Sequence, residues 1–168
     1  MPHIDYKVPR LIRPVAQPDD KSCWAAAATV MISWRRQATL SISDALQQVP
    51  GGWLRYYQTE PWGLDPILLS TFVEACGMAH EPLQCYTPAG WLELMEWYGP
   101  LAVVTHPFTY YVRVLWGMKG DLDRVGAGLT MRVIEPEGGR FAQEPFPRFA
   151  ASVTQASRIP AAQVWHWP

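Results

Sequence analysis

The chain has 168 residues, with 14 Lys and Arg against 15 Asp and Glu and a formal net charge of −1. A single domain of this length buries about 70% of the surface that its unfolded chain exposes, so a core can form without disulfides or a metal. The balanced charge, with no basic run longer than Arg35-Arg36, excludes the electrostatic footprint of a nucleic-acid-binding protein, and we expect no nucleic-acid partner.

The start of the sequence shows no targeting signal. Residues 1–8 lack the basic start and apolar run of a signal peptide. No apolar stretch approaches the roughly 20 residues that cross a bilayer. We expect a soluble protein that is cytoplasmic as synthesised, and its export would need a route without an N-terminal signal peptide.

Four helices are predicted in the first half of the chain, because four capping residues each precede an apolar pattern of helical period. The capping residues are Ser22, Ser41, Asp65 and Thr87. The helices are predicted to end near residue 37, before residue 50, at residue 76 and before residue 99. The first of them should be the central, buried helix, and an aromatic loop over residues 53–62 is expected between the second and the third.

The second half of the chain changes to strand patterns. Runs rich in β-branched and aromatic residues over 101–105, 110–116 and 129–134 are separated by turn residues. Residues 162–167 predict a last strand at an edge of the sheet. Helices followed by antiparallel strands indicate an α+β fold. We expect one domain over residues 1–168, with a helical half over about 17–98 and a β half over about 100–168.

The segment from Gln17 to Trp24 has the layout of a thiol beside an oxyanion donor. Cys23 is expected at the start of a helix, where unpaired N–H groups and the helix dipole favour negative charge, so the thiol pKa should fall. Gln17 lies one short loop away, and its amide is placed to donate to the oxyanion of a tetrahedral intermediate. The alternative is a buried cysteine with a glutamine that only holds its loop.

Gln17, Cys23 and Trp24 resemble, in identity and spacing, the nucleophile motif of the papain-like cysteine peptidases. Residues 99–104, 111–117 and 133–136 resemble three strands of the compact bacterial members, which include secreted effector peptidases. The resemblance implies a papain-like fold, in which a central nucleophile helix of the helical half packs on an antiparallel sheet. It also implies a protein or peptide as substrate or partner, and no cofactor.

The imidazole that such a thiol needs is missing from its expected place. The resemblance aligns the family's histidine with Tyr111, or with Tyr110 after a shift of one residue. Neither phenol, with an ordinary pKa of about 10, replaces imidazole at neutral pH. His106 is then the candidate base, and the alternative is a solvent-facing loop histidine. Glu135 takes the place of the Asn or Asp that orients the imidazole, or else it caps a turn.

The other aromatic residues of interest suggest a groove. Trp24 should pack under the nucleophile, and the aromatic loop, Tyr56 included, should line a substrate groove or close the core. The residues expected to bind substrate are Trp24, Trp53, Tyr57, Trp62, Tyr110 and Tyr111.

The remaining histidines and cysteines are expected to have no catalytic role. His3, His80 and His166 are expected at the surface or in an interface. Cys76 and Cys85 lie in apolar sequence and should be buried small hydrophobes. No pair of cysteines has C-x-x-C spacing, so we expect no metal site.

Two functions of different classes remain open. The first is a cysteine hydrolase of peptidase or acyl-transfer type, acting as a bacterial effector or toxin, with Cys23 as nucleophile and Gln17 as oxyanion donor. The second is a pseudopeptidase that keeps the fold and groove but binds a protein or peptide without cleaving it. The Gln-Cys-Trp motif favours the first, and the missing imidazole favours the second.

Overall fold

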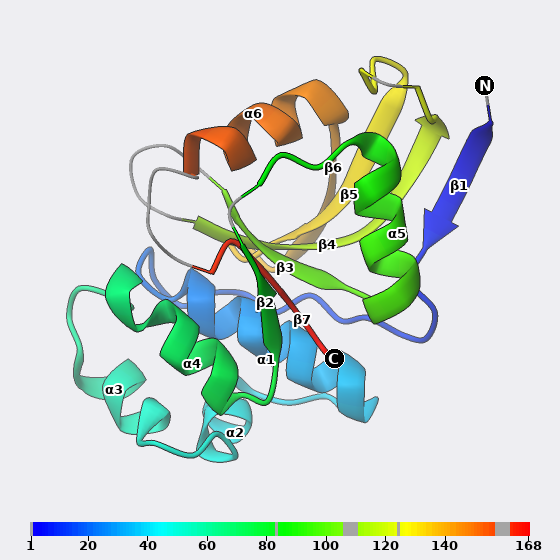
Figure 1. Ribbon diagram of the computed structural model, residues 1–168. Helices are drawn as coiled ribbons and strands as arrows, with labels where there is room; N and C mark the ends of the chain where they lie inside the picture. The colour runs from blue at the N-terminus through cyan, green and yellow to red at the C-terminus, as the bar shows by residue number, and fades with distance from the viewer. Residues whose placement is uncertain (1, 83, 106–110, 124, 157–161) are drawn as a thin grey trace.

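The structure is a computed structural model that describes residues 2–82, 84–105, 111–123, 125–156 and 162–168 (Figure 1). Within these residues, seven strands form one antiparallel sheet in the order β2-β7-β3-β4-β5-β6, with β1 paired to the second half of β4. The strands are β1 His3–Lys7, β2 Ala79–Glu81, β3 Leu101–Thr105, β4 Tyr111–Asp121, β5 Leu129–Glu135, β6 Arg140–Pro145 and β7 Val164–His166. The helices are α1 Cys23–Arg36, α2 Ile42–Gln47, α3 Trp53–Thr59, the 3-10 helix η1 Pro66–Leu68, α4 Leu69–Ala75, α5 Pro88–Tyr98 and α6 Phe146–Ala156.

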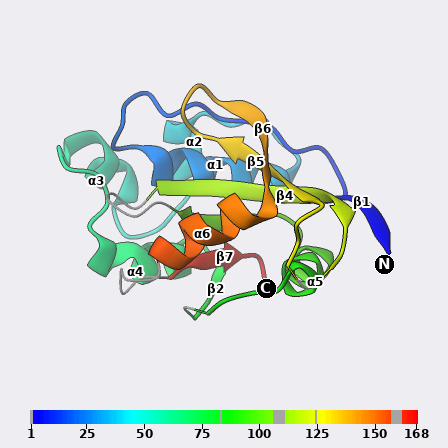
Figure 2. The ribbon, with the colours of Figure 1, turned by 90° about the horizontal axis from the view of Figure 1, so that it is seen from above.

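Helices cover both faces of the sheet (Figure 2). α1 packs against one face, on β3 and β4, while α5 and α6 pack against the other. α2, α3 and α4 gather around α1, away from the centre of the sheet (Figure 1). This arrangement confirms the predicted α+β fold, in which a central helix lies on an antiparallel sheet.

α1 is buried along almost its whole length, as predicted. Every residue from Cys23 to Trp34 is buried. The four alanines at 25–28 are at most 1% exposed, and their short side chains allow the helix to approach the sheet closely. Arg35 and Arg36 occupy the last turn, where the helix dipole favours positive charge.

Three of the predicted helix starts are confirmed by hydrogen bonds. The side chains of Ser41, Asp65 and Thr87 accept from backbone N–H groups two or three residues ahead, at 3.0, 3.0 and 3.1 Å. These bonds satisfy N–H groups that a helix cannot pair by itself. The third predicted helix differs in one respect, since it begins as the 3-10 turn η1 before α4 continues it.

Other elements differ from the prediction. α3 replaces the expected aromatic loop, and it begins after Gly52, which has a left-handed conformation and offers no side-chain cap. The predicted edge strand near the end of the chain is wrong in its position. β7 lies between β2 and β3, where Trp165 faces His80 on one side and Ala102 on the other. All three residues of β7 are buried, which suits an interior strand.

Among the described residues, two strands lie within the mainly helical first part of the chain, and one helix lies within the second part, which is mainly strands. β1 precedes the helices and pairs with β4, and β2 leaves the helical residues to join the sheet. α6 in turn follows β6 and covers the sheet. In the described part of the chain, none of the helices has the length and apolar character to cross a lipid bilayer.

Candidate functional site

Cys23 is the first residue of α1 and lies against the start of β4. The residue is 5% exposed, and burial raises the pKa of its thiol. Backbone N–H groups of Val112, Trp24 and Cys23 itself interact with the sulfur and act in the opposite direction, while the charge of Asp19 adds to the rise. The expected lowered pKa is therefore wrong, because burial outweighs the amides of the helix start.

The start of α1 differs from the prediction in its cap as well. Ser22 precedes the helix, but its hydroxyl donates to Asp19 Oδ1 at 2.6 Å and makes no capping bond. The same Asp19 oxygen accepts from the backbone N–H of Lys21 at 2.9 Å. The predicted Ser22 cap is wrong because a carboxylate three residues earlier competes for the hydroxyl. The Asp19 carboxylate also places a negative charge near the Cys23 thiol.

Tyr111 begins β4, directly before the Val112 amide that interacts with the Cys23 sulfur. Its hydroxyl accepts a hydrogen bond from the backbone N–H of Glu137 at 3.0 Å. The pKa of Tyr111 is raised to about 12, first by burial and then by the charges of Glu135 and Cys23, while the hydrogen bond from the Glu137 amide acts in the opposite direction. The phenol thus stays protonated at neutral pH and is held by the turn after β5.

Glu135 ends β5 and has a cationic partner. Its Oε1 accepts from Arg113 Nη1 at 2.9 Å, across the two neighbouring strands β4 and β5. The carboxylate expected to orient an imidazole, or to cap a turn, binds a guanidinium instead. The sequence alone did not identify Arg113, although a charged residue in the middle of an apolar strand is a signal for a buried ion pair.

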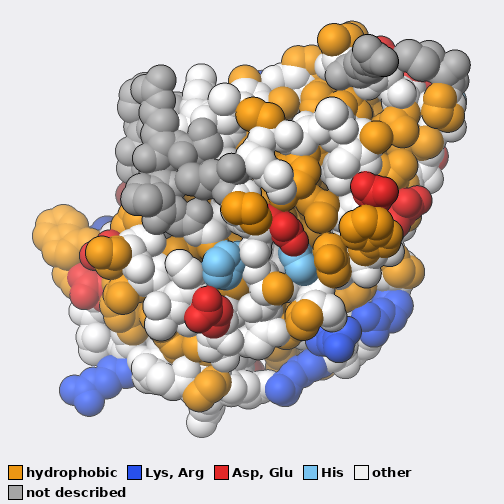
Figure 3. Space-filling view, in the orientation of Figure 1, with side chains coloured by type: hydrophobic (Ala, Val, Ile, Leu, Met, Phe, Trp, Pro, Cys, Tyr) orange, Lys and Arg blue, Asp and Glu red, His pale blue; other side chains and the backbone are white. Residues whose placement is uncertain are grey.

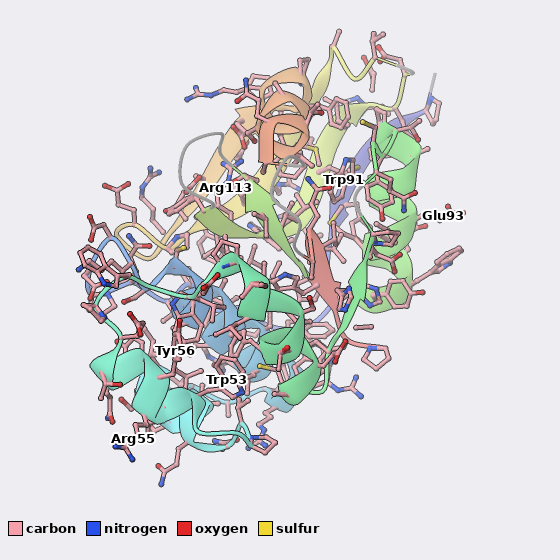
Figure 4. All side chains as sticks on the ribbon, turned by 60° about the vertical axis from the view of Figure 1, so that its left-hand side comes forward. Trp53, Arg55, Tyr56, Trp91, Glu93 and Arg113 are labelled. Atoms are coloured by element: carbon pink, nitrogen blue, oxygen red, sulfur yellow. The ribbon has the colours of Figure 1, made fainter. Side chains whose placement is uncertain are left out.

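Arg113 is the centre of a buried polar cluster between the sheet and α6 (Figure 4). The residue is 8% exposed, and its Nη2 also lies 2.6 Å from Glu144 Oε1. Its Nε donates to Thr105 Oγ1 at 3.1 Å, and its guanidinium lies 5.7 Å from the centre of the Phe149 ring. Two carboxylates thus share one buried cation.

Gln17 lies on the segment before α1, which is attached to the turn after β5. Its backbone N–H donates to the carbonyl of Pro136 at 2.8 Å. Gly139, with φ +56°, packs on the same segment, and a Cβ there would come within 2.6 Å of the Ala16 nitrogen. The side-chain Oε1 of Gln17 is buried and has no hydrogen-bond partner among the described residues. The turn between β5 and β6 therefore sets the place of Gln17.

The aromatic residues predicted to bind substrate divide into core and surface. Trp24 is 2% exposed and makes edge contacts with Tyr56, Tyr57 and Phe72, at centroid distances of 6.0, 6.2 and 4.9 Å. Trp53 is also buried and contacts Tyr56 and Phe72. Figure 4 shows Trp53 and Tyr56 on α3. Both tryptophans therefore help to close the core.

An open pocket of about 150 Å³ lies beside the start of α1. Ser22 and Trp24, on either side of Cys23, line it together with Tyr57. Trp62 is 84% exposed in the neighbouring loop, and Lys21 lies 5.7 Å from the centre of its ring. Among the predicted substrate residues, Tyr57 therefore lines this pocket and Trp62 is exposed beside it.

The described histidines are engaged elsewhere in the molecule, and His106 and Tyr110 lie outside the described residues. His3 pairs with Asp121, and His80 contacts Glu74 at 3.3 Å. His166 is 3% exposed and lies 2.7 Å from a Glu81 oxygen, so the prediction of a surface position for it is wrong. It is buried because β7 is an interior strand.

The two other cysteines differ from each other. Cys85 is exposed, so its predicted burial is wrong, whereas Cys76 is partly buried and burial raises the pKa of its thiol to about 12. Cys85 belongs to the connection between β2 and α5, where its neighbour Gln84 is exposed as well. No three His, Cys, Asp or Glu side chains gather into a metal-binding group in the part of the chain that the structure describes.

Comparison with solved structures finds the same fold in two transporter-associated peptidases. One is a double glycine motif protease from an AMS/PCAT transporter, solved in complex with the leader peptide. It has a TM-score of 0.56 and 15% identity, and the match covers 97% of this chain and 96% of that chain. The other is the peptidase domain of Streptococcus ComA, a bifunctional ABC transporter involved in quorum sensing. It has a TM-score of 0.54 and 12% identity, with coverage of 94% and 100%.

Comparison of the sequence with protein families gives a match over residues 2–154, to the family described as papain-like cysteine protease AvrRpt2. No curated protein sequence matches the chain. The matched range contains Gln17, Cys23, Tyr111 and Glu135, and the papain-like fold predicted from the nucleophile motif is confirmed. The chain therefore belongs to the papain-like cysteine protease family of AvrRpt2.

Proposed function

We propose that this member of a peptidase family is a pseudopeptidase, which binds a peptide or protein segment beside α1 without cleaving it. The observation that carries the proposal is the residue at the start of β4. Tyr111 stands directly before the amide that interacts with Cys23, and Arg113 binds Glu135, the carboxylate that would otherwise orient an imidazole.

The described residues beside Cys23 do not supply the proton transfer that cleavage needs. A thiol nucleophile needs a base to remove its proton and an acid to protonate the leaving amine, which together contribute about 10²–10⁴ in rate. Burial keeps the Cys23 thiol protonated at neutral pH, and the Tyr111 phenol has a pKa of about 12. Neither group offers a base, so a bound peptide would remain intact.

The surface beside α1 supports peptide binding. The open pocket next to Cys23 adjoins Trp62, an exposed ring of the kind that dominates protein interfaces. Lys21 lies over this ring and adds a positive charge. One structural relative was solved with a leader peptide, which makes a peptide the natural class of ligand to test.

A cysteine hydrolase is the second candidate, and one observation favours it. Three backbone N–H groups surround the Cys23 sulfur and favour its thiolate. In this alternative His106 is the base, Gln17 stabilises the oxyanion, and the protein acts as a bacterial effector. Acyl-transfer chemistry would suit it best, because its leaving groups need less protonation than an amine.

Alkylation of Cys23 distinguishes the two candidates. Iodoacetamide modification is followed by mass spectrometry from acidic pH to about pH 10, with exposed Cys85 as internal control in the same digest. For a pseudopeptidase, Cys23 reacts only at alkaline pH, and His106→Ala and His80→Ala leave its profile unchanged. A reactive component below about pH 7 that His106→Ala alone removes would establish the hydrolase instead.

Peptide binding is tested with a phage-displayed random peptide library selected on the wild type. The selected peptides should bind wild type and Cys23→Ala equally and stay intact in both cases. Trp62→Ala should weaken binding about tenfold. Phe141→Ala, which removes an exposed aromatic ring on β6, is the matched control. Equal losses in the two variants, or cleavage by wild type alone, would contradict the proposal.

A further inference from the structure

A second hollow surface lies at the opposite end of α1 from Cys23. A helix of 14 residues spans about 21 Å, so the two regions are well separated. Here a pocket of about 210 Å³ adjoins another of about 220 Å³, and Arg35 and Trp167 line both. The ends of α1, α5 and the chain meet at this place (Figure 1). We call it the Arg–Trp surface, defined by Arg10, Trp34, Arg35, Trp97, Tyr98 and Trp167.

The indole rings of this surface are fixed by the fold. Trp34 donates its Nε1–H to the carbonyl of Pro9 at 2.9 Å. Gly99, with φ +82°, leaves room for the ring, since a Cβ there would come within 2.4 Å of it. Trp167 donates its Nε1–H to the carbonyl of Met31 at 3.1 Å. Trp34 is buried and supports Arg10 from beneath, whereas Trp167 is partly exposed. A ligand would therefore meet side chains that are already in position, which limits the entropy lost on binding.

Arginine side chains lie over these rings. The Arg10 guanidinium is 4.3 Å from the centre of the Trp34 ring, and that of Arg35 is 5.8 Å from the centre of the Trp167 ring. Arg36 lines the second pocket. Among the described residues, none of the three has a carboxylate within ion-pair distance. Lys and Arg side chains also gather at the lower right of the molecule, where α1 ends (Figure 3).

Arg10 has a strained backbone. Its φ is +68°, a left-handed conformation that glycine adopts more easily than a long side chain does. Strain of this kind persists where the rest of the structure requires it and is concentrated at functional positions. The strained residue is the one that places a cation over Trp34. Arginine at position 10 therefore makes the folded protein less stable than glycine would at the same position.

We propose that the Arg–Trp surface binds an acidic segment of a partner protein. Carboxylates of the segment pair with Arg10 and Arg35, and apolar side chains between them enter the two pockets. Trp97, which is 65% exposed, and Tyr98 complete the Trp, Tyr and Arg composition that dominates protein interfaces. None of these contacts depends on the chemistry at Cys23.

A protein segment fits this surface better than a nucleic acid does. Glu96 lines the first pocket and would repel a continuous phosphate backbone, whereas a peptide can place an apolar side chain there. The whole chain also has a net charge of −1, which gives no general attraction for polyanions. Two separate pockets of side-chain size suit alternating acidic and apolar residues.

The experiment uses the intact protein and two fluorescein-labelled peptides, one in which Glu alternates with Leu and Phe and one with Gln in place of each Glu. Fluorescence anisotropy should show at least about tenfold tighter binding of the Glu peptide, and added salt should weaken it. Arg10→Gly should reduce the affinity several-fold while keeping or raising the melting temperature. Arg35→Glu and Trp97→Ala should also weaken binding.

A matched control makes the result specific. Arg55→Glu makes the same charge change on α3, away from the Arg–Trp surface, so it should bind the Glu peptide like wild type. Equal binding of the two peptides, an equal loss in Arg55→Glu, or no saturation below about 1 mM peptide overturns the proposal. Tighter binding of oligodeoxythymidine than of the Glu peptide does so as well.

Discussion

Arg113 and Glu135 form an ion pair of 2.9 Å across β4 and β5, between the sheet and α6. The side chains are 9% and 16% exposed, so the pair is largely shielded from water. Glu144 joins the same guanidinium from β6 at 2.6 Å. Three neighbouring strands are thus connected through one arginine.

Arg113→Leu should destabilise the protein by about 3–5 kcal/mol, because it leaves two carboxylates buried without their cation. Urea unfolding measures the change. The triple variant Arg113→Leu, Glu135→Gln, Glu144→Gln should recover most of the loss, since it removes the unpaired charges.

Arg148→Leu is the control, because that side chain is 82% exposed and lies 3.8 Å from Glu144. It should cost less than about 1 kcal/mol. A loss as large as that of Arg113→Leu would contradict this account.

Stability should fall at alkaline pH. The pKa of Cys76 is raised from 9.0 to about 12 and that of Tyr111 from 10.0 to about 12, both by burial first. Each group binds its proton more tightly when folded, so its contribution is complete below the unfolded pKa and is lost as pH rises toward 12. Urea unfolding in steps above about pH 9 measures this.

Cys76→Ala and Tyr111→Phe should each flatten this pH dependence. Cys85→Ala, at an exposed cysteine, is the matched control and should leave it unchanged. Tyr111→Phe should also cost about 0.5–1.5 kcal/mol at neutral pH, through the lost bond from the Glu137 amide. A slope that none of these substitutions alters would show that other groups cause the alkaline loss.

Gly99→Ala should destabilise the fold by at least about 2 kcal/mol, because Gly99 has φ +82° and its Cβ would come within 2.4 Å of the Trp34 ring. Gly90→Ala, in the first turn of α5, is the control. A Cβ there meets its nearest neighbours at ordinary contact distances, starting at 3.4 Å. Better helix propensity should then stabilise the protein by about 0.5–1 kcal/mol. Thermal unfolding of both variants checks the opposite signs.

His166→Ala should cost about 2–3 kcal/mol of unfolding free energy. The imidazole lies 2.7 Å from Glu81 and stacks on Tyr98 with 3.8 Å between the ring centres, so it connects β7 to β2 and α5. His80→Ala, on the neighbouring strand and less buried, should change stability by about 0.5 kcal/mol or less. Similar losses at both positions would rule out a special role for His166.

What the sequence could predict was local in character. Ser41, Asp65 and Thr87 mark helix starts because a cap and its partner N–H lie two or three residues apart. The nucleophile motif is equally short, and it led to the correct fold. The helix α3 was not predicted, because Gly52 supplies no capping side chain and the start of the helix therefore has no local signal.

What the sequence could not predict depends on distant contacts. Cys23 is buried where α1 packs on β3 and β4, far along the chain, and this burial reverses the expected direction of its pKa shift. The partner of Glu135 could not be read from Arg113 alone, because a second carboxylate from Glu144 joins the cluster. The interior position of β7 likewise depends on pairing with two strands that are distant in sequence.

The place of β7 between β2 and β3 has a consequence for how the protein is made. On the ribosome, β3, β4, β5 and β6 can pair as soon as each emerges, because they are consecutive in the sheet. β2 is synthesised before all of them, yet its partner in the sheet is Val164–His166. Until translation has passed His166, β2 and β3 expose unpaired backbone to other chains. A nascent chain stalled earlier should therefore need a chaperone to keep these edges apart.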